Sequence, residues 1–143
     1  LAMQPLYENR IVAVLPQDHR LAGREQISSR DLQGERFIGY GSEIPFGQLV
    51  HRIFGSEENQ PAPQVEVQQA HVACAMVQAG VGVALVDELT IRGPSWSSVV
   101  AIPVAPMVHA PIHAFNLALQ PMSRLAQEFV RVLKTLEQSA AKP

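Results

Sequence analysis

Between residues 71 and 88 the hydrophobic positions change from a helical spacing to a continuous run. In the first half, hydrophobic residues recur at the three- and four-residue spacing of one helix face, and these are Val72, Ala75, Met76 and Ala79. Gly80 follows where a helix favours a left-handed C-terminal cap, and residues 81–86 form an apolar run typical of a strand buried on both faces. Asp87 and Glu88 then stand at the carboxyl end of this strand, where open α/β sheets bind their ligands. The pattern predicts a helix-to-strand unit of an α/β fold that binds a small molecule.

The same criteria predict further strands along the chain. These strands lie at residues 10–15, 36–40, 64–68, 98–104 and 112–119. Polar and apolar residues alternate in the strand at 64–68, which favours a position near an edge of the sheet. Ser28 or Ser29 is expected to cap a short turn that carries Leu32, and residues 93–95 are expected to form another turn.

Two more helices are predicted. One begins at Pro45, since proline favours the first helical position, and ends at Gly55. Its apolar face consists of Phe46, Leu49, Val50, Ile53 and Phe54. The other helix is capped by Ser123, and its apolar stripe consists of Leu125, Phe129, Val132, Leu133 and Leu136. We expect this stripe to pack on another surface.

Composition narrows the class of protein. The chain has 143 residues, of which 47% are hydrophobic and 17% charged, as is ordinary for one globular domain with a real core. A net charge of −2 without any basic run argues against direct binding to nucleic acid. No apolar run approaches the ~20 residues of a membrane helix, and the first residues do not resemble a signal peptide, so we expect a cytoplasmic protein with no membrane partner.

The sequence offers little support for catalysis, a metal or a cofactor. Cys74 is the single cysteine, and on an apolar helix it is expected to be a packing residue, although a pairing with His71 keeps an enzyme open as an alternative. The histidines lack the spacing of metal ligands. Residues 80–82, Gly-Val-Gly, follow a helix and lack the third glycine of a dinucleotide-binding motif. We expect no catalytic residue, no metal and no cofactor.

Several motifs in order resemble the effector-binding domain of LysR-type transcriptional regulators. The first are Ile-Val-Ala-Val-Leu-Pro at 11–16, Asp-His-Arg-Leu-Ala at 18–22, Asp-Leu at 31–32 and Phe-Ile at 37–38. Val-Glu-Val at 65–67, Val-Gln-Ala-Gly-Val-Gly-Val-Ala at 77–84, Ile-Pro-Val at 102–104 and the strand 114–119 follow in the same order. The resemblance covers nearly the whole chain. It implies an α/β fold of the periplasmic-binding-protein-like type 2 class, here a truncated one, with a Rossmann-like mixed sheet flanked by helices.

The resemblance also implies how the chain is divided. The family's effector domain has two lobes joined by two crossover strands, with the ligand between the lobes. Residues 10–15 are expected to be the first crossover, 16–111 the second lobe, 114–119 the return crossover and 123–138 the closing helix of the first lobe. The chain would then be a partial domain without the helix-turn-helix, so DNA would be bound only through that absent amino-terminal part. Self-association to a dimer or tetramer is expected.

A candidate effector site combines this placement with helix electrostatics. A helix that starts near Ile44 presents unpaired N–H groups and a partial positive charge. The expected cradle for a carboxylate is therefore Gly41, Ser42, Glu43 and Ile44. Tyr40 and Phe46 would shape its walls, and the resemblance places Gln69 and His71 nearby. Glu43 and Glu88 would meet a cationic group, since carboxylates pair well with guanidinium.

Each of these residues also has an ordinary structural interpretation. Gly41 and Ser42 are compatible with a simple strand-to-helix turn, and Glu43 with a charge that complements a helix start. His71 would then bond to the backbone, and Asp87 and Glu88 would form a solvated strand end.

The function implied is effector sensing in a transcriptional regulator. A ligand in the cleft would shift the arrangement of the lobes and, through it, the DNA-bound oligomer. The run Val-Ala-Leu-Val-Asp-Glu at 83–88 resembles the branch that senses octopine or nopaline, so the effector would be amino-acid-like, an opine or another small carboxylate. The alternative is a solute-binding receptor of a transport system with the same two-lobed fold.

Overall fold

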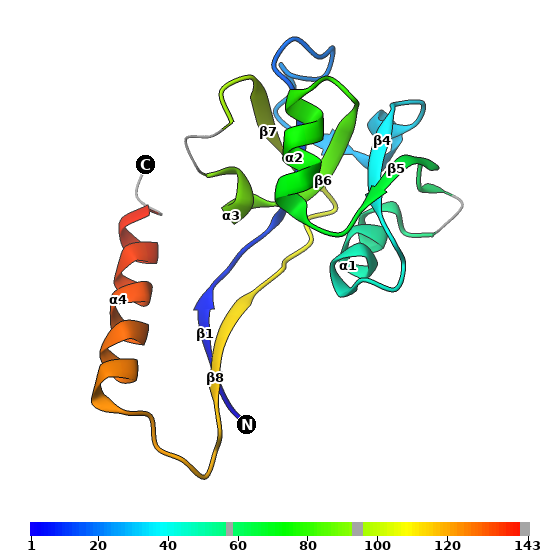
Figure 1. The fold of residues 1–143 in the computed structure, drawn as a ribbon. Coiled ribbons are helices and arrows are strands. Elements are labelled where there is room, and N and C mark those ends of the chain that lie inside the picture. Colours follow the sequence, from blue (N-terminus) through cyan, green and yellow to red (C-terminus); the bar gives the residue numbers. More distant parts are fainter. Residues whose placement is uncertain (57–58, 93–95, 141–143) are drawn as a thin grey trace. The chain divides into compact units, whose positions relative to one another are not determined.

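The structure is a computed structural model that describes residues 1–56, 59–92 and 96–140. The turn predicted at 93–95 lies outside these ranges. Contacts between residues divide the chain into two units, of which the larger is Arg10–Ala110 and the smaller joins Leu1–Asn9 to Pro111–Pro143 (Figure 1).

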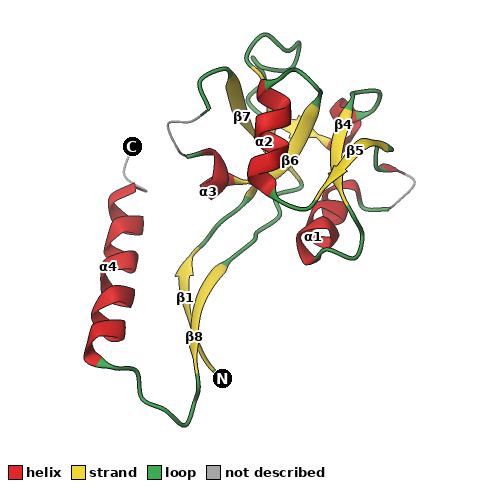
Figure 2. Cartoon of the chain, viewed as in Figure 1, coloured by secondary structure: helices red, strands yellow, loops and turns green. Residues whose placement is uncertain are grey.

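The larger unit is built on a six-stranded mixed sheet (Figure 2). In spatial order its strands are β3 (Ile27–Ser28), β7 (Val99–Ala105), β2 (Ile11–Pro16), β6 (Val83–Asp87), β4 (Phe37–Tyr40) and β5 (Pro63–Val67). Strand β2 runs antiparallel to both of its neighbours, whereas β4 is parallel to β5 and β6, and β3 is parallel to β7. Five strands therefore share one direction and β2 opposes them. The predicted mixed α/β sheet is confirmed.

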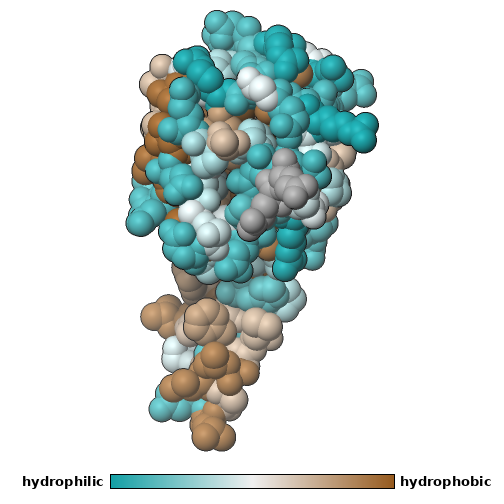
Figure 3. All heavy atoms as spheres, turned by 90° about the vertical axis from the view of Figure 1, so that its right-hand side faces the viewer, coloured by the Kyte–Doolittle hydropathy of each residue, from teal (hydrophilic) through white to brown (hydrophobic). Residues whose placement is uncertain are grey.

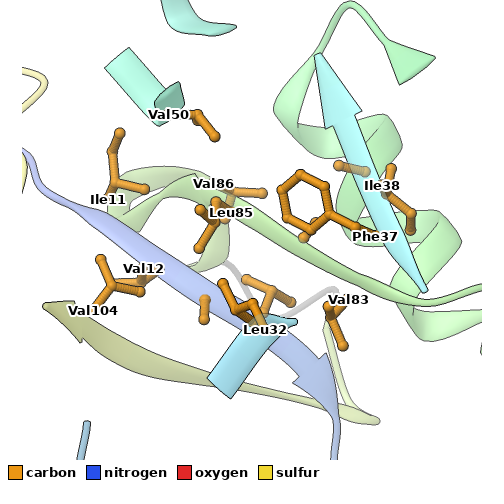
Figure 4. Close-up of a cluster of buried hydrophobic side chains, with 14 of the residues drawn as sticks. Ile11, Val12, Leu32, Phe37, Ile38, Val50, Val83, Leu85, Val86 and Val104 are labelled. Atoms are coloured by element: carbon orange, nitrogen blue, oxygen red, sulfur yellow. The ribbon is translucent and has the colours of Figure 1, made fainter. Parts of the chain in front are cut away.

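The hydrophobic core surrounds the central strands (Figure 4). Residues 11–15 of β2 and 83–86 of β6 are all buried. Because successive side chains of a strand point to opposite faces, this continuous burial means that the sheet is covered on both faces. The Phe37 ring meets the Phe54 ring edge to face, with centroids 5.7 Å apart, and so joins β4 to the first helix.

The helices of this unit are short and lie where their end signals predict. Helix α1 (Pro45–Phe54) starts with proline and is followed by Gly55 at φ 73°. Helix α2 (Ala70–Gln78) ends in a Schellman motif, in which Gly80 has φ 76° and donates to the Val77 carbonyl while Val81 donates to that of Met76. Two shorter helical segments are η1 (Ser29–Leu32), with Ser28 at its N-cap as predicted, and α3 (Glu88–Ile91), which was not predicted.

The buried face of α2 differs from the prediction. Ala73, Cys74 and Val77 are buried, whereas Val72, Ala75 and Ala79 of the predicted face are exposed. The helix carries apolar residues around most of its circumference, so spacing alone does not define one face.

The smaller unit consists of a two-stranded antiparallel ladder and one long helix. Strand β1 (Ala2–Tyr7) pairs with β8 (Ile112–Asn116), and α4 (Arg124–Ala140) contacts β1. The amide of Gln4 on β1 accepts a hydrogen bond from Lys134 Nζ of α4 at 3.3 Å. Strand β1 was not predicted from the sequence, and β8 is shorter than the predicted strand at 112–119.

The structure gives the strand partners of the two segments that were expected as crossovers. Residues 10–15 were expected as the first crossover, and strand β2 in this segment is hydrogen-bonded to a strand on each side in the six-stranded sheet. The partner of β8 is β1. The chain passes between the two units at Asn9–Arg10, which follows β1, and at Ala110–Pro111, which precedes β8.

The smaller unit exposes many large apolar side chains. On the strands and the following segment these are Leu1, Met3, Phe115, Leu117 and Leu119. On α4 they are Leu125, Phe129, Val132 and Leu136. The predicted stripe of α4 is therefore largely exposed, and Leu133 is the member that is half-buried.

Candidate functional site

One edge of the six-stranded sheet collects most of the predicted site residues. The five co-directional strands end there, so the loops after β4, β5 and β6 emerge on the same side. Because β2 runs the other way, its amino end and Arg10 lie at this edge too. The Ile11 N–H donates to the Val108 carbonyl at 2.9 Å, so the segment after β7 also returns here. This carboxyl edge is where open α/β sheets bind ligands.

The loop at Gly41–Ile44 leads from β4 into α1 and leaves helix donors unsatisfied. Ile44 is the N-cap, and its side chain cannot cap the helix. Its N–H donates to the Gly41 carbonyl at 3.1 Å, and Pro45 has no N–H. Among the described residues, the N–H groups of Phe46 and Gly47 find no hydrogen-bond acceptor. A helix start with free donors attracts an anion.

Two side chains of this loop are exposed, and each has a defined setting. The Ser42 carbonyl accepts a hydrogen bond from Gln48 Nε2 at 3.3 Å, and the Ser42 residue is exposed. The Glu43 carboxylate folds back over Gly41, in the space that a side chain at position 41 would fill. Glu43 therefore lies beside the helix start.

Tyr40 and Phe46 form the aromatic wall that was predicted beside the loop. Their rings pack edge to face with centroids 5.0 Å apart. Tyr40 is only 3% exposed, and burial raises the pKa of its hydroxyl, with Cys74 and Asp87 adding to the shift. The hydroxyl is therefore neutral, and it has no hydrogen-bond partner among the described residues.

Gln69 and His71 lie at the start of α2, directly after β5. Gln69 is the N-cap, and its carbonyl accepts from the N–H groups of Val72 and Ala73, both at 3.2 Å. The Gln69 side chain makes no capping bond and is exposed. The His71 side chain is also exposed and bonds to no described residue, so the backbone bond considered for it is not formed.

Glu88 has a different setting from the one expected. Arg10 donates to its carboxylate from Nε at 2.9 Å and from a terminal nitrogen at 3.2 Å, and Arg92 lies 3.5 Å away. Burial raises the pKa of Glu88, but the hydrogen bonds and charge of Arg10, with those of Arg92, outweigh it and hold this pKa below its ordinary value. Glu88 was expected to meet a cationic ligand group, and the structure instead pairs it with two arginines of the protein.

Asp87 and Cys74 are structural in this fold. The Asp87 carboxylate accepts from the Thr90 N–H at 3.0 Å and from the Thr90 hydroxyl at 2.6 Å, and so caps α3. Cys74 is fully buried, and burial, with a smaller contribution from Asp87, raises the pKa of its thiol to about 11. A buried neutral thiol is a poor nucleophile.

The described ranges contain neither a cluster of metal ligands nor a membrane-spanning helix. No three side chains of histidine, cysteine, aspartate or glutamate come together as metal ligands would. No helix in those ranges has both the length and the apolar character that crossing a membrane requires.

Comparison with known families decides what this architecture is. Residues 1–138 match the family model described as the LysR substrate binding domain. The chain belongs to this family. Among relatives of this LysR substrate-binding domain, the transcriptional activator protein LysR of Escherichia coli strain K12 is 32% identical over 124 residues, which are 82% of this chain and 38% of the relative.

Two further proteins are similar to this chain. The octopine catabolism/uptake operon regulatory protein OccR of Rhizobium meliloti is 32% identical over 76 residues, 53% of this chain and 25% of its own length. The CcmR regulatory domain of Synechocystis PCC6803, solved in complex with 2-PG, superposes with a TM-score of 0.76 at 19% identity, over 96% of this chain and 67% of that one. This last likeness shows the fold, and the LysR substrate-binding domain described here spans well under half of the E. coli relative.

The sequence did not identify Arg10 or Gln48 as parts of the site. Arg10 was predicted as the first residue of a strand, and only the reversed direction of β2 brings it beside Glu88. Gln48 is an exposed polar residue of α1. The sequence pattern predicted only the apolar face of this helix. Neither position carries a motif.

Proposed function

We propose that the carboxyl edge of the larger unit is half of an effector site, and that it binds the carboxylate of a small molecule at the start of α1. The free N–H groups of Phe46 and Gly47 carry this proposal, because an anion completes their hydrogen bonding. The exposed Ser42 hydroxyl would add a donor. Tyr40 and Phe46 would support the loop from beneath, and Gln69 and His71 would approach the ligand from α2.

The effector is proposed to be amino-acid-like, an opine or another small carboxylate. One relative is named for an octopine catabolism/uptake operon, and the CcmR regulatory domain was solved with 2-PG. Because Arg10 and Arg92 already neutralise Glu88, a cationic group of the effector is more simply met by Glu43, whose carboxylate is exposed and adjustable.

The smaller unit is proposed to be part of the first lobe, with β1 and β8 as the two crossover strands. The exposed apolar side chains of β8 and α4 support this proposal, since surfaces of this size are normally covered. The 67% coverage of the CcmR regulatory domain leaves room for such additional structure. Self-association of the protein would also cover these exposed apolar side chains.

In the whole protein, effector binding is proposed to control a DNA-bound oligomer in the cytoplasm, with DNA held by a segment outside this chain. A ligand shifts such an equilibrium only by its differential affinity for the two arrangements, typically ~1–3 kcal/mol. A transport receptor is less favoured because the curated relatives are named as regulators. An enzyme is less favoured because the Cys74 thiol is buried and neutral.

The test is a thermal-shift panel on the full-length parent protein with arginine, ornithine, lysine, opines and aromatic acids. A ligand that binds only the folded state raises its melting temperature. We expect one chemical class to do so, and the Ser42→Ala variant to show a smaller shift while keeping the melting temperature of the free protein. Glu25→Gln, an exposed change elsewhere, is the matched control. An unchanged shift in Ser42→Ala would argue against this loop as the carboxylate site.

A further inference from the structure

A groove runs along one flank of the larger unit, between α1 and the segment that leads into β5. Its volume is about 360 Å³, and its lining includes Tyr40, Ser42, His51, Gln60, Pro63 and Glu66. Figure 3 views the molecule from the side on which α1 and β5 lie in Figure 1, and the surface there is largely hydrophilic. We call this feature the flank groove. Its volume is within the usual range of small-molecule sites.

The flank groove leads away from the carboxyl edge. Tyr40, at its upper end, pairs with Val67 at the carboxyl end of β4 and β5. Pro63, at its lower end, pairs with Phe37, the first residue of β4. The groove therefore extends over the length of the strand, and most of its lining lies outside the proposed effector site.

Unsatisfied polar atoms gather on the residues that line this groove. In the described part of the chain, three buried side-chain atoms lack a hydrogen-bond partner: Tyr40 OH, His51 Nδ1 and Gln60 Oε1. All three residues line the flank groove. Burying a polar atom without a partner is unfavourable, and most such atoms in proteins are satisfied. Because each of these atoms has almost no exposed surface, a ligand in the groove would supply the missing partners only after these side chains turn toward it.

The chemistry of the lining selects a ligand that donates hydrogen bonds. Gln60 Oε1 is an acceptor only, and His51 Nδ1 accepts in one of its neutral tautomers. Glu66 adds an exposed carboxylate, which forms neither an ion pair nor a hydrogen bond with any described residue. A negative charge beside neutral acceptors favours an ammonium group.

We propose that the flank groove binds a small molecule through its ammonium group, held by the Glu66 carboxylate and Gln60 Oε1, with His51 beside them. Glu66, Gln60 and His51 are not part of the carboxylate site at the start of α1, although Tyr40 and Ser42 border both. The proposal does not rest on the proposed function, so an effector site elsewhere would leave it intact.

The test uses L-alaninamide as a probe, at a pH where its amine is protonated, and N-acetyl-L-alaninamide as the matched probe without an ammonium group. Both are titrated into the isotope-labelled 143-residue chain, and amide and histidine side-chain NMR signals are followed. We expect saturable shifts at His51, Gln60 and Glu66 with the ammonium probe and none with the acetylated one.

Two variants separate this site from a general surface effect. Glu66→Gln should weaken binding of the ammonium probe about tenfold, because it removes a charge-assisted hydrogen bond from an exposed position. Glu25→Gln should leave the affinity unchanged. Gln60→Met should weaken binding with a native-like spectrum. Equal shifts with both probes, shifts confined to the Gly41–Ile44 loop, or unchanged affinity in Glu66→Gln and Gln60→Met would overturn the proposal.

Discussion

Replacing Gly47 by alanine tests how closely α1 is held against the loop that precedes it. Gly47 is the third residue of α1 and is buried. A Cβ at this position would lie less than 3.0 Å from the Gly41 carbonyl oxygen and 3.2 Å from Tyr40 Cβ. The oxygen belongs to the backbone and accepts the Ile44 N–H at 3.1 Å, so it cannot rotate away as a side chain would. The helix has to move.

The sign of the effect follows from two opposed contributions. In an unobstructed helix, glycine to alanine stabilises by about 1 kcal/mol. An overpacked core position costs about 1–3 kcal/mol, and contact with a fixed backbone atom favours the upper part of that range. We therefore expect Gly47→Ala to lower the free energy of unfolding by about 1–2 kcal/mol.

Denaturant unfolding measures this change. Trp96 is the single tryptophan and is half-buried, and its indole N–H donates to the Thr90 carbonyl at 2.9 Å. Its fluorescence therefore reports unfolding of the larger unit. The control is Gly23→Ala, where no neighbour lies within 4 Å of the new Cβ. If Gly47→Ala proves as stable as the unaltered chain, or more stable, then the close approach of α1 to Gly41 is not a constraint on this fold.

Three other outcomes are expected. Arg10→Met should lower stability by about 1 kcal/mol near neutral pH, since Arg10 is 39% exposed and its pair with Glu88 is partly screened. The folded pKa of Glu88 is depressed, so its contribution is present above its unfolded pKa and is lost as pH falls through the folded value; denaturation curves of the two proteins should converge in acid, and a constant gap would contradict the pairing. Phe129→Gln, at a side chain 62% exposed, should reduce self-association in light scattering without loss of stability, and unchanged association would exclude the α4 stripe as the contact. The Cys74 thiol should react with a disulfide reagent only after unfolding, so rapid labelling of the native chain would contradict its burial.

Elements with strong local signals could be predicted from the sequence. Pro45 and Gly55 mark the ends of α1, and Gly80 marks the end of α2, because each residue's backbone preference acts at its own position. The apolar run before Asp87 identified β6 for the same reason. The family resemblance, which rests on several such segments in order, gave the fold class.

Features that depend on distant partners could not be predicted. Strand β1 has no marked periodicity of its own, and its pairing with β8 joins residues more than a hundred positions apart. The buried face of α2 is selected by the sheet beneath it, since most of its residues are apolar. Glu88 was assigned to a ligand because its partner Arg10, 78 positions away, could not be located without the strand order.

The reversed direction of β2 brings the amino end of that strand to the sheet edge that holds the proposed carboxylate site. If β2 ran with the other five strands, its amino end would lie at the opposite edge, away from the loop at Gly41–Ile44. In the observed topology Arg10, at the exit of the larger unit, is fixed to Glu88 and bridged to His109 on the returning segment. A carboxylate bound at the start of α1 would therefore act at the same edge as both exits. If the proposed carboxylate site is correct, a mutation of the Arg10 to Glu88 pair should alter the response to the ligand without removing the ligand's own contacts.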